Sequence, residues 1–241
     1  LHKIGDPQKQ LKFVHVAGTN GKGSFCSMLD SVLRKAGYRT GLFTSPYVLR
    51  FNERMCADGK EIADRELAEI VEYIKPYADE MSDAPTEFEF ITAVGMEYFK
   101  RHRCEIVVLE VGMGGRLDST NIIETSVLSV ITGIALDHTA YLGDTVEKIA
   151  AEKAGIIKPG VPVVLGRNEP SVRAVVEARA RELGAPFFYA PELASEDEVP
   201  ADFSLVGSFN RENAVTALAA LKVLGGDRAV TQAQARSFAR V

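Results

Sequence analysis

The sequence predicts an α/β fold, with a mostly parallel sheet and helices on both of its faces. Two observations carry this prediction. Short apolar segments alternate with longer segments of helical periodicity along the chain, which is the pattern of doubly covered strands joined by crossover helices. The polar motifs also follow directly after apolar segments or lie close to helix ends, as expected where ligands bind beyond the carboxyl ends of parallel strands.

Five segments are predicted to be strands because each is short and apolar. They are Lys12–Val16, Thr40–Phe43, Ile106–Val111, Val127–Thr132 and Val161–Leu165. Six other segments have the composition of helices, and right-handed crossovers would place them on both faces of the sheet. They are Gly23–Lys35, Asp64–Lys75, Glu87–Arg101, Val146–Ala154, Pro170–Leu183 and Arg211–Leu224.

Two segments do not fit this alternation. Phe187–Phe203 carries Pro191 and Pro200 among acidic residues, and we interpret it as an excursion or a short antiparallel piece. Residues 226–241 have helical composition but close no domain, so they are predicted to be a linker that leads onward. The 241 residues are otherwise expected to form one domain.

Composition excludes several classes of protein. The net charge is −5 with no basic stripe, which argues against a nucleic-acid partner. Three scattered cysteines fit neither a disulfide framework nor a zinc site, and a reducing cytoplasm is the expected compartment. No apolar run approaches the ~18 residues of a membrane span. The first seven residues are not a signal peptide and lack an initiator Met, so we expect the chain to begin inside a longer protein.

The segment 13–24 is the most informative part of the chain. An apolar run is followed by a glycine-rich turn, then by Lys22 and Ser24, then by a helical pattern. A glycine loop between a strand and a helix start forms an anion site, because backbone N–H groups converge there and the helix dipole favours phosphate. Lys22 would reach the outer phosphates of a nucleoside triphosphate and Ser24 would lie near Mg²⁺. The spacing differs from the usual phosphate loop, and a plain glycine-rich turn is the alternative.

Two further motifs follow predicted strands. Ser45-Pro46 is followed by an Arg-Phe-Asn-Glu-Arg run, although a proline there could simply end the strand. Glu110 lies at the tip of an otherwise apolar strand, ahead of a Gly-Met-Gly-Gly loop. A carboxylate is costly to bury unless it is paired or binds a metal. This position suits a magnesium-coordinating acid, and an ion pair with Arg116 is the alternative.

Two more candidates are weaker from chemistry alone. His138 follows the apolar strand that ends near Thr132. A lone histidine is as readily a structural residue as a ligand, and Mg²⁺ prefers oxygen. Lys153 lies near the end of a helix that Gly155 stops, where a solvated lysine is the ordinary interpretation.

Taken together, these motifs resemble the folylpolyglutamate synthase/dihydrofolate synthase family of the Mur ligase superfamily. The matching segments occur in the family's order and cover most of the chain: 15–24, 44–46, 51–54, 86–89, 110–118, 136–139 and 152–156. The resemblance implies a Mur-ligase-like central domain of the phosphate-loop class. Tyr47 and the Phe209-Asn210 pair depart from residues that are frequent in the family, and neither touches the phosphate or metal residues.

The resemblance also implies an activity and its residues. ATP would phosphorylate a folate or dihydropteroate carboxylate, and the amine of L-glutamate would attack the acyl phosphate to form an amide. The nucleotide-binding residues implied are Thr19, Asn20, Gly21, Lys22, Gly23, Ser24 and Asn213. The magnesium ligands implied are Ser45, Glu110, His138 and Lys153, the last as a carbamate, with Lys22, His138 and Lys153 counted as catalytic. The substrate residues implied are Thr86, Glu87, Phe88, Glu89, Leu117, Asp118 and Ser119.

Some of these residues have simpler interpretations. Thr86 and Glu89 alone indicate a helix N-terminal cap, and Asn213 alone would be a polar residue on an exposed helix face. A family member is expected to have a C-terminal domain after about residue 241 that supplies the glutamate site, and to be a monomer when full length. A peptidoglycan-type amide ligase and a nucleotide-binding module without catalysis are the alternative functions. A GTPase fits poorly because no guanine-reading Asn-Lys-x-Asp run occurs.

Overall fold

The described part of the chain is built around an eight-stranded sheet. The computed structural model describes residues 1–200, 203, 205 and 207–225. The strand order is β4-β3-β2-β5-β1-β6-β7-β8, with β2, β5, β1, β6, β7 and β8 parallel. The strands are β1 (Phe13–Ala17), β2 (Thr40–Phe43), β3 (Met55–Ala57), β4 (Lys60–Glu61), β5 (Ile106–Glu110), β6 (Ser126–Ile131), β7 (Val163–Leu165) and β8 (Phe187–Tyr189).

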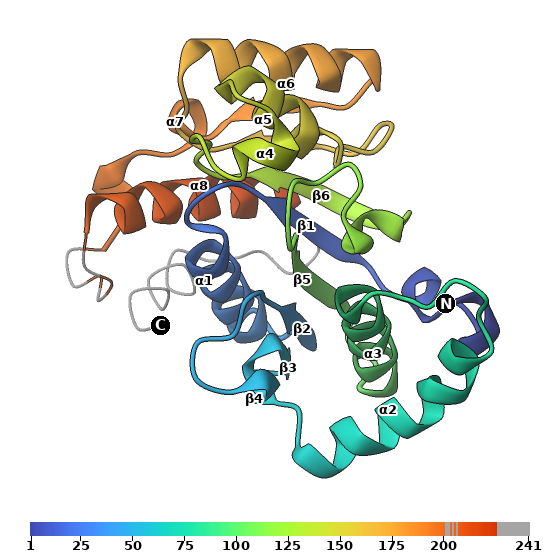
Figure 1. The fold of residues 1–241 in the computed structure, drawn as a ribbon. Coiled ribbons are helices and arrows are strands. Elements are labelled where there is room, and N and C mark those ends of the chain that lie inside the picture. The colour runs from blue at the N-terminus through green and yellow to red at the C-terminus, as the bar shows by residue number, and fades with distance from the viewer. Residues whose placement is uncertain (201–202, 204, 206, 226–241) are drawn as a thin grey trace.

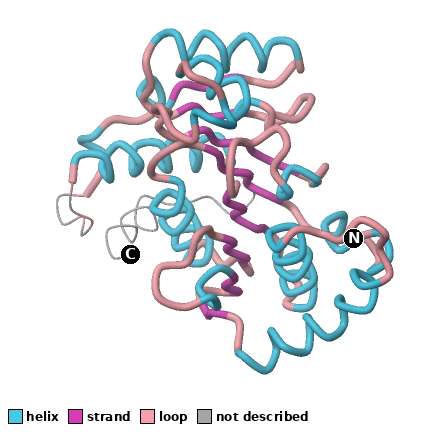
Figure 2. Tube along the Cα trace, in the orientation of Figure 1, coloured by secondary structure: helices cyan, strands magenta, loops and turns pink. Residues whose placement is uncertain are grey.

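Helices cover both faces of this sheet (Figures 1 and 2). They are α1 (Lys22–Lys35), α2 (Asp64–Asp79), α3 (Glu87–Arg101), α4 (Thr139–Leu142), α5 (Val146–Ala154), α6 (Pro170–Glu182), α7 (Ala190–Leu193) and α8 (Ser208–Leu224). Alternate strand residues face opposite layers. Val14 and Val16 of β1 pack with α1 and α8, whereas Phe13 packs with α3 and Ala17 with α5 and α6. The predicted α/β architecture is confirmed.

The structure corrects the sequence prediction at three places. Phe187–Phe203 is not an antiparallel piece, because β8 pairs in parallel with β7. The prolines and acidic residues that suggested an excursion belong mainly to α7 and to the short 3₁₀ turn Glu196–Glu198. The helix predicted to end at Lys75 continues to Asp79 with Pro76 inside it. A proline in the last turn costs a helix less than one at its centre.

The third correction is an addition to the sheet edge. Strands β3 and β4 were not predicted, since they are only three and two residues long. They extend the sheet in antiparallel fashion beyond β2. The predicted linker 226–241 lies outside the described residues, so its interpretation stays a prediction.

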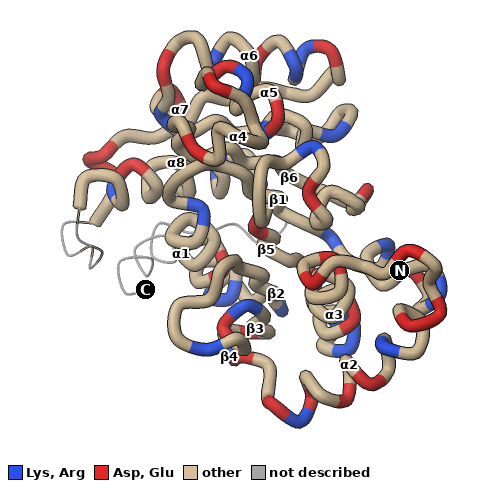
Figure 3. Tube along the Cα trace, in the orientation of Figure 1, with Lys and Arg blue, Asp and Glu red and all other residues tan. Residues whose placement is uncertain are grey.

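The surface charge is mixed, and none of the described helices has the length and apolar composition that a membrane span needs. Figure 3 shows both basic and acidic residues along α2 and α6. The parallel strands β1, β2, β5 and β6 all end at the same side of the sheet, its carboxyl edge. Val16 of β1 lies beside Glu110 of β5 and Val130 of β6, so the loops after these strands converge.

Candidate active site

The loop after β1 presents an open helix N-terminus. Gly21 adopts a left-handed conformation with φ 80° and forms the N-cap of α1, which no side chain caps. Glycine takes this conformation without strain. A Cβ added at Gly21 would also overlap the side chain of Asn213 from α8. The first N–H groups of α1 are therefore left for an anion, as the sequence predicts.

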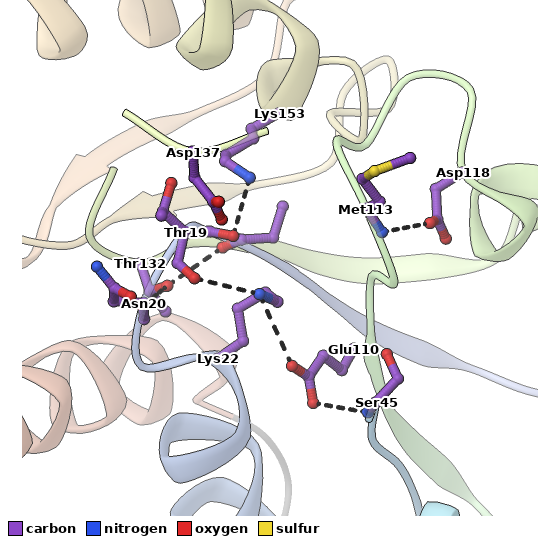
Figure 4. Close-up of polar contacts among 12 residues, drawn as sticks. Thr19, Asn20, Lys22, Ser45, Glu110, Met113, Asp118, Thr132, Asp137 and Lys153 are labelled. Carbon is purple, nitrogen blue, oxygen red and sulfur yellow. Dashed lines mark hydrogen bonds and ion pairs between the residues drawn. The ribbon is translucent and has the colours of Figure 1, made fainter. Parts of the chain in front are cut away.

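Lys22 lies between this loop and β5. Its Nζ is 3.4 Å from the Thr19 carbonyl, to which it donates, and 3.9 Å from Oε1 of Glu110 (Figure 4). Glu110 Oε2 accepts a hydrogen bond from the backbone N–H of Ser45 at 3.2 Å. Burial raises the pKa of the Glu110 carboxyl to about 7, while Lys22 and the Ser45 N–H oppose the rise. The loops after β1, β2 and β5 thus meet at one carboxylate.

The alternative partner for Glu110 is excluded. Arg116 pairs instead with Glu152 of α5, with Nη2 3.0 Å from Oε1. Ser45 Oγ is buried and has no hydrogen-bond partner among the described residues. An unpartnered hydroxyl beside a carboxylate offers the hard oxygen atoms that Mg²⁺ prefers. The residues here therefore fit a magnesium ion.

His138 is placed differently from Ser45 and Glu110. It has φ 48°, its side chain is 52 % exposed, and its Nε2 is 3.6 Å from Oδ2 of Asp137. No described contact joins His138 to Ser45 or Glu110, and within the described ranges no cluster of three or more His, Cys, Asp or Glu side chains is arranged to hold a metal. The metal-ligand role of His138 stays a prediction.

Lys153 is not the solvated lysine that its helix position indicates. It is buried in α5, and its Nζ donates to the carbonyl of Gly18 at 2.9 Å (Figure 4). Burial, helped by the nearby charge of Lys22, lowers the pKa of Lys153 to about 8. Lys153 is therefore an interior residue in contact with the phosphate loop, and its role as a metal ligand stays a prediction.

Two cavities adjoin each other through residues 116–119, and the smaller of them borders the residues described above through Ser45 and Glu152. One, of about 620 Å³, is lined by Ser45, Pro46, Arg54 and Phe88 and by the loop of residues 112–119, together with Tyr141, Leu142 and Glu152. The other, of about 710 Å³, shares residues 116–119 and includes Glu89. Of the predicted substrate residues, these cavities bring together Phe88, Glu89, Leu117, Asp118 and Ser119.

Thr86 and Glu87 are absent from the lining of either cavity. Thr86 instead caps α3. Its Oγ1 accepts from the N–H of Glu89 at 3.3 Å, and Glu89 Oε2 accepts from the N–H of Thr86 at 2.7 Å. The capping interpretation of this motif is confirmed. The substrate role of Thr86, Glu87 and Glu89 stays a prediction.

Thr19 and Asn20 tie the phosphate loop to the loop after β6. Thr19 Oγ1 donates to the Ala135 carbonyl at 3.1 Å and lies 3.2 Å from the Ala135 N–H, and Asn20 forms a backbone bridge to Gly133. Asn213 Nδ2 is buried against this loop without a hydrogen-bond partner among the described residues. Asn213 therefore does not lie on an exposed helix face.

Sequence reasoning missed the residues that hold the loops. Thr132 Oγ1 donates to the Asn20 carbonyl at 2.8 Å, and Asn168 bonds to three backbone groups after β6 and β7. Thr120 is a fully buried residue of the 3₁₀ turn η4 (Ser119–Ile122), whose neighbours Ser119, Asn121 and Ile122 line the larger cavity. The available signal was position, since Thr132 and Asn168 each follow closely after an apolar strand.

The first strand of this parallel sheet leads into a glycine loop with a lysine, and the loop leads into a helix whose N-terminus no side chain caps. This arrangement defines an α/β domain of the phosphate-loop class. Within that class, the chain belongs to the Mur ligase family, because residues 16–183 match the Mur ligase middle domain. It is 39% identical to "Dihydrofolate synthase/folylpolyglutamate synthase" of Bacillus subtilis, over 93% of this chain and 57% of that protein. It is 45% identical to "Folylpolyglutamate synthase" of Lacticaseibacillus casei, over 77% of this chain and 44% of that protein.

Solved structures show the same likeness. The apo form of L. casei FPGS matches with a TM-score of 0.91 at 37% identity, over 100% of this chain and 65% of that one. An FPGS-AMPPCP-folate complex matches with a TM-score of 0.90 at 37% identity, over 98% of this chain and 64% of that one. The chain spans about half the length of the curated relatives it matches.

Proposed function

We propose that this chain is the ATP-binding domain of a ligase that adds L-glutamate to the carboxylate of a folate or dihydropteroate. The observation that carries the proposal is the meeting of Lys22, Glu110 and Lys153 beside the phosphate loop, next to cavities large enough for such a substrate. The names of the relatives favour the folate branch of the family over the peptidoglycan branch.

In this proposal the chain's residues bind and orient the reactants. The N-terminus of α1 and the Lys22 ammonium hold the triphosphate, and the buried Asn213 amide contacts the nucleotide. The loop 112–119 holds the folate so that its carboxylate faces the γ-phosphate. The carboxylate attacks that phosphorus atom, ADP leaves, and the glutamate amine then displaces phosphate from the acyl phosphate. Positioning and charge stabilisation supply most of the rate in such reactions.

Magnesium is the metal that these residues suit. Ser45 Oγ and Glu110 would hold it, joined through the family resemblance by His138 and Lys153. When bound, Mg²⁺ would neutralise the charge that builds on the transferring phosphoryl group.

Lys153 is expected to carry a carbamate in the active protein. A neutral amine adds CO₂ and releases one proton, which turns a cation into an oxygen ligand. Burial beside Gly18 favours the neutral amine, because it lowers the pKa of Lys153 to about 8. ¹³C-bicarbonate labelling followed by NMR should give a carbamate signal that Lys153→Ala abolishes. An unmodified Lys153 in active protein kept in bicarbonate would contradict the expectation.

Product analysis tests the proposed function as a whole. The full-length protein is incubated with Mg·ATP, L-glutamate and either dihydropteroate or tetrahydrofolate, and products are identified by mass spectrometry. Glutamylated folate together with ADP and phosphate is the expected result. Nucleotide binding without any product would favour a non-catalytic module, and product from a peptidoglycan precursor alone would favour the other branch of the family.

A further inference from the structure

His15 is a buried histidine that the proposed chemistry does not use. It lies in β1, between Leu109 of β5 and Ser129 of β6, and its side chain is fully buried. Its Nε2 is 2.9 Å from Oγ1 of Thr120, which is 105 residues away in the sequence and also fully buried. Burying polar side chains in a protein core is costly unless they form hydrogen bonds.

The direction of this hydrogen bond follows from the next one. Thr120 Oγ1 donates its only hydrogen to Oδ1 of Asp118 at 2.5 Å, and the Thr120 N–H donates to the same oxygen at 3.0 Å. Thr120 Oγ1 can therefore only accept from His15, so Nε2 of His15 carries the proton. Burial lowers the pKa of His15 to about 3, which keeps the ring neutral with Nδ1 as a buried nitrogen that has no partner among the described residues.

The series of hydrogen bonds ends on the loop that lines both cavities. Oδ2 of Asp118 accepts from the backbone N–H of Met113 at 2.8 Å, and so closes the loop across five residues (Figure 4). Gly112 lies so close that an added Cβ would be 3.1 Å from the same oxygen. Residues 112–119 line the smaller cavity, and residues 116–119 line the larger one as well.

We propose that His15 and Thr120 are positioning residues for the substrate cavity: together they orient the Asp118 carboxylate, and through it the loop 112–118. The core of β1 would in this way set the shape of the substrate site as well as carry the phosphate loop at its end. The proposal rests on the proposed function only for the identity of the molecule that occupies the cavity.

The proposal predicts different effects on the binding of the folate substrate and on the binding of Mg·ATP. Removing the Thr120 hydroxyl breaks two hydrogen bonds, the one from His15 Nε2 and the one to Asp118 Oδ1. These bonds form the relay from His15 to Asp118, and Lys22, Glu110 and the N-terminus of α1 are not part of it. The folate substrate should then bind more weakly while Mg·ATP binds as before. A loss of fold stability alone would weaken the binding of both ligands to the same extent. A change in folate binding without a change in Mg·ATP binding therefore distinguishes a positioning role from a general loss of stability.

The experiment compares Thr120→Val, which keeps the shape but lacks the hydroxyl, with Thr120→Ser, which keeps the hydroxyl. Thr216→Val is the matched control, since it removes a buried hydroxyl in α8 that bonds to the Glu212 carbonyl. Hydrogen exchange of the Met113 amide is followed in this chain. KM for tetrahydrofolate or dihydropteroate and KM for Mg·ATP are measured in the full-length protein.

We expect Thr120→Val to speed exchange of the Met113 amide about tenfold and to raise the folate KM about tenfold, with the ATP KM within about twofold of wild type. Thr120→Ser and Thr216→Val should resemble wild type in all three. Unchanged Met113 exchange in Thr120→Val, or equal rises in both KM values, would overturn the proposal. If the wild-type protein glutamylates no folate, the proposed function fails, while the exchange measurement still decides whether the relay positions the loop.

Discussion

Lys22 joins the phosphate loop to the carboxylate at the tip of β5, and its ammonium group is held between the Thr19 carbonyl and Glu110. Both contacts are long, at 3.4 and 3.9 Å. A cation that is only loosely bound by its own protein can turn toward an incoming phosphate at little cost. We therefore expect Lys22 to contact the triphosphate although the spacing of the loop is unusual.

Lys22→Ala should weaken Mg·ATP binding by at least about tenfold, because a charge-assisted hydrogen bond to phosphate is lost. Isothermal titration of Mg·ATP into the two proteins measures the change. Lys75→Ala is the control, since Lys75 is an exposed residue of α2 that pairs with Asp79. Equal affinity and equal hydrolysis in Lys22→Ala and wild type would contradict the assignment.

His15 makes stability depend on pH in a predictable direction. Its pKa is about 3 in the folded protein against an ordinary 6.5. Between these values the unfolded chain binds more protons, so the free energy of unfolding falls as pH falls below 6.5. Between pH 7.5 and 5.5, His15 alone should lower the free energy of unfolding by about 1 kcal/mol. Glu110 acts in the opposite direction, because its pKa is raised to about 7 from an ordinary 4.5.

The comparison of wild type with His15→Gln isolates this effect. Chemical denaturation at pH 7.5 and 5.5 gives the change in unfolding free energy for each protein. The variant lacks the titrating group, so it should lose about 1 kcal/mol less than wild type over this range, whatever Glu110 contributes to both. Identical pH dependence of the two proteins would show that His15 is not held neutral in the folded state.

At the scale of elements, the loop after β6 is held from two sides. Thr19 bonds to the Ala135 backbone from the phosphate loop. From the loop after β7, Asn168 Oδ1 accepts from the Ile134 N–H at 2.8 Å, and its Nδ2 donates to the Thr132 and Gly166 carbonyls. The segment that carries His138 is thus fixed to its neighbours by one threonine and one asparagine.

Asn168→Ala should free this segment. Three backbone groups lose their partner, and leaving such groups unpaired costs about 1–3 kcal/mol. Faster hydrogen exchange at residues 133–138 and a lower melting temperature are the expected results. Glu169→Ala is the control, because Glu169 is exposed and its side chain caps nothing at the start of α6. If exchange at residues 133–138 is the same in both variants, Asn168 does not hold the loop.

At the scale of the whole molecule, the carboxyl ends of the parallel strands bring Lys22, Ser45 and Glu110 together, while the curated relatives are about twice as long as this chain. Amide formation requires both reactants to be held in near-attack geometry and the acyl phosphate to be shielded from water. The described residues form a phosphate loop and two adjoining cavities, and we propose no site for the glutamate amine among them.

A polypeptide of these 241 residues should therefore bind Mg·ATP weakly and form no glutamylated product by itself. Incubation with ATP, Mg²⁺, L-glutamate and tetrahydrofolate or dihydropteroate, followed by mass spectrometry, measures this directly. The full-length protein under the same conditions is the positive control. Product from the 241-residue polypeptide at about 1 per second or faster would show that it holds both substrates unaided.

The sequence determined what depends on neighbouring residues. The apolar runs of β1, β2, β5, β6 and β7, the glycine loop before α1 and the Thr86–Glu89 cap all follow from spacings of a few residues. Periodicity and local hydrogen bonding fix such features, so they can be predicted without knowing the fold. The position of several motifs directly after predicted strands also indicated the carboxyl edge of the sheet as the place of the site.

The tertiary structure alone decided which partners these residues have. Glu110 pairs with Lys22 and not with the nearby Arg116, Lys153 reaches the Gly18 carbonyl across 135 residues of sequence, and His15 reaches Thr120 across 105. The direction of β8 was decided in the same way. The physical reason is that a side chain's burial, partner and pKa depend on the segments packed against it, and packing between distant segments leaves no local pattern in the chain.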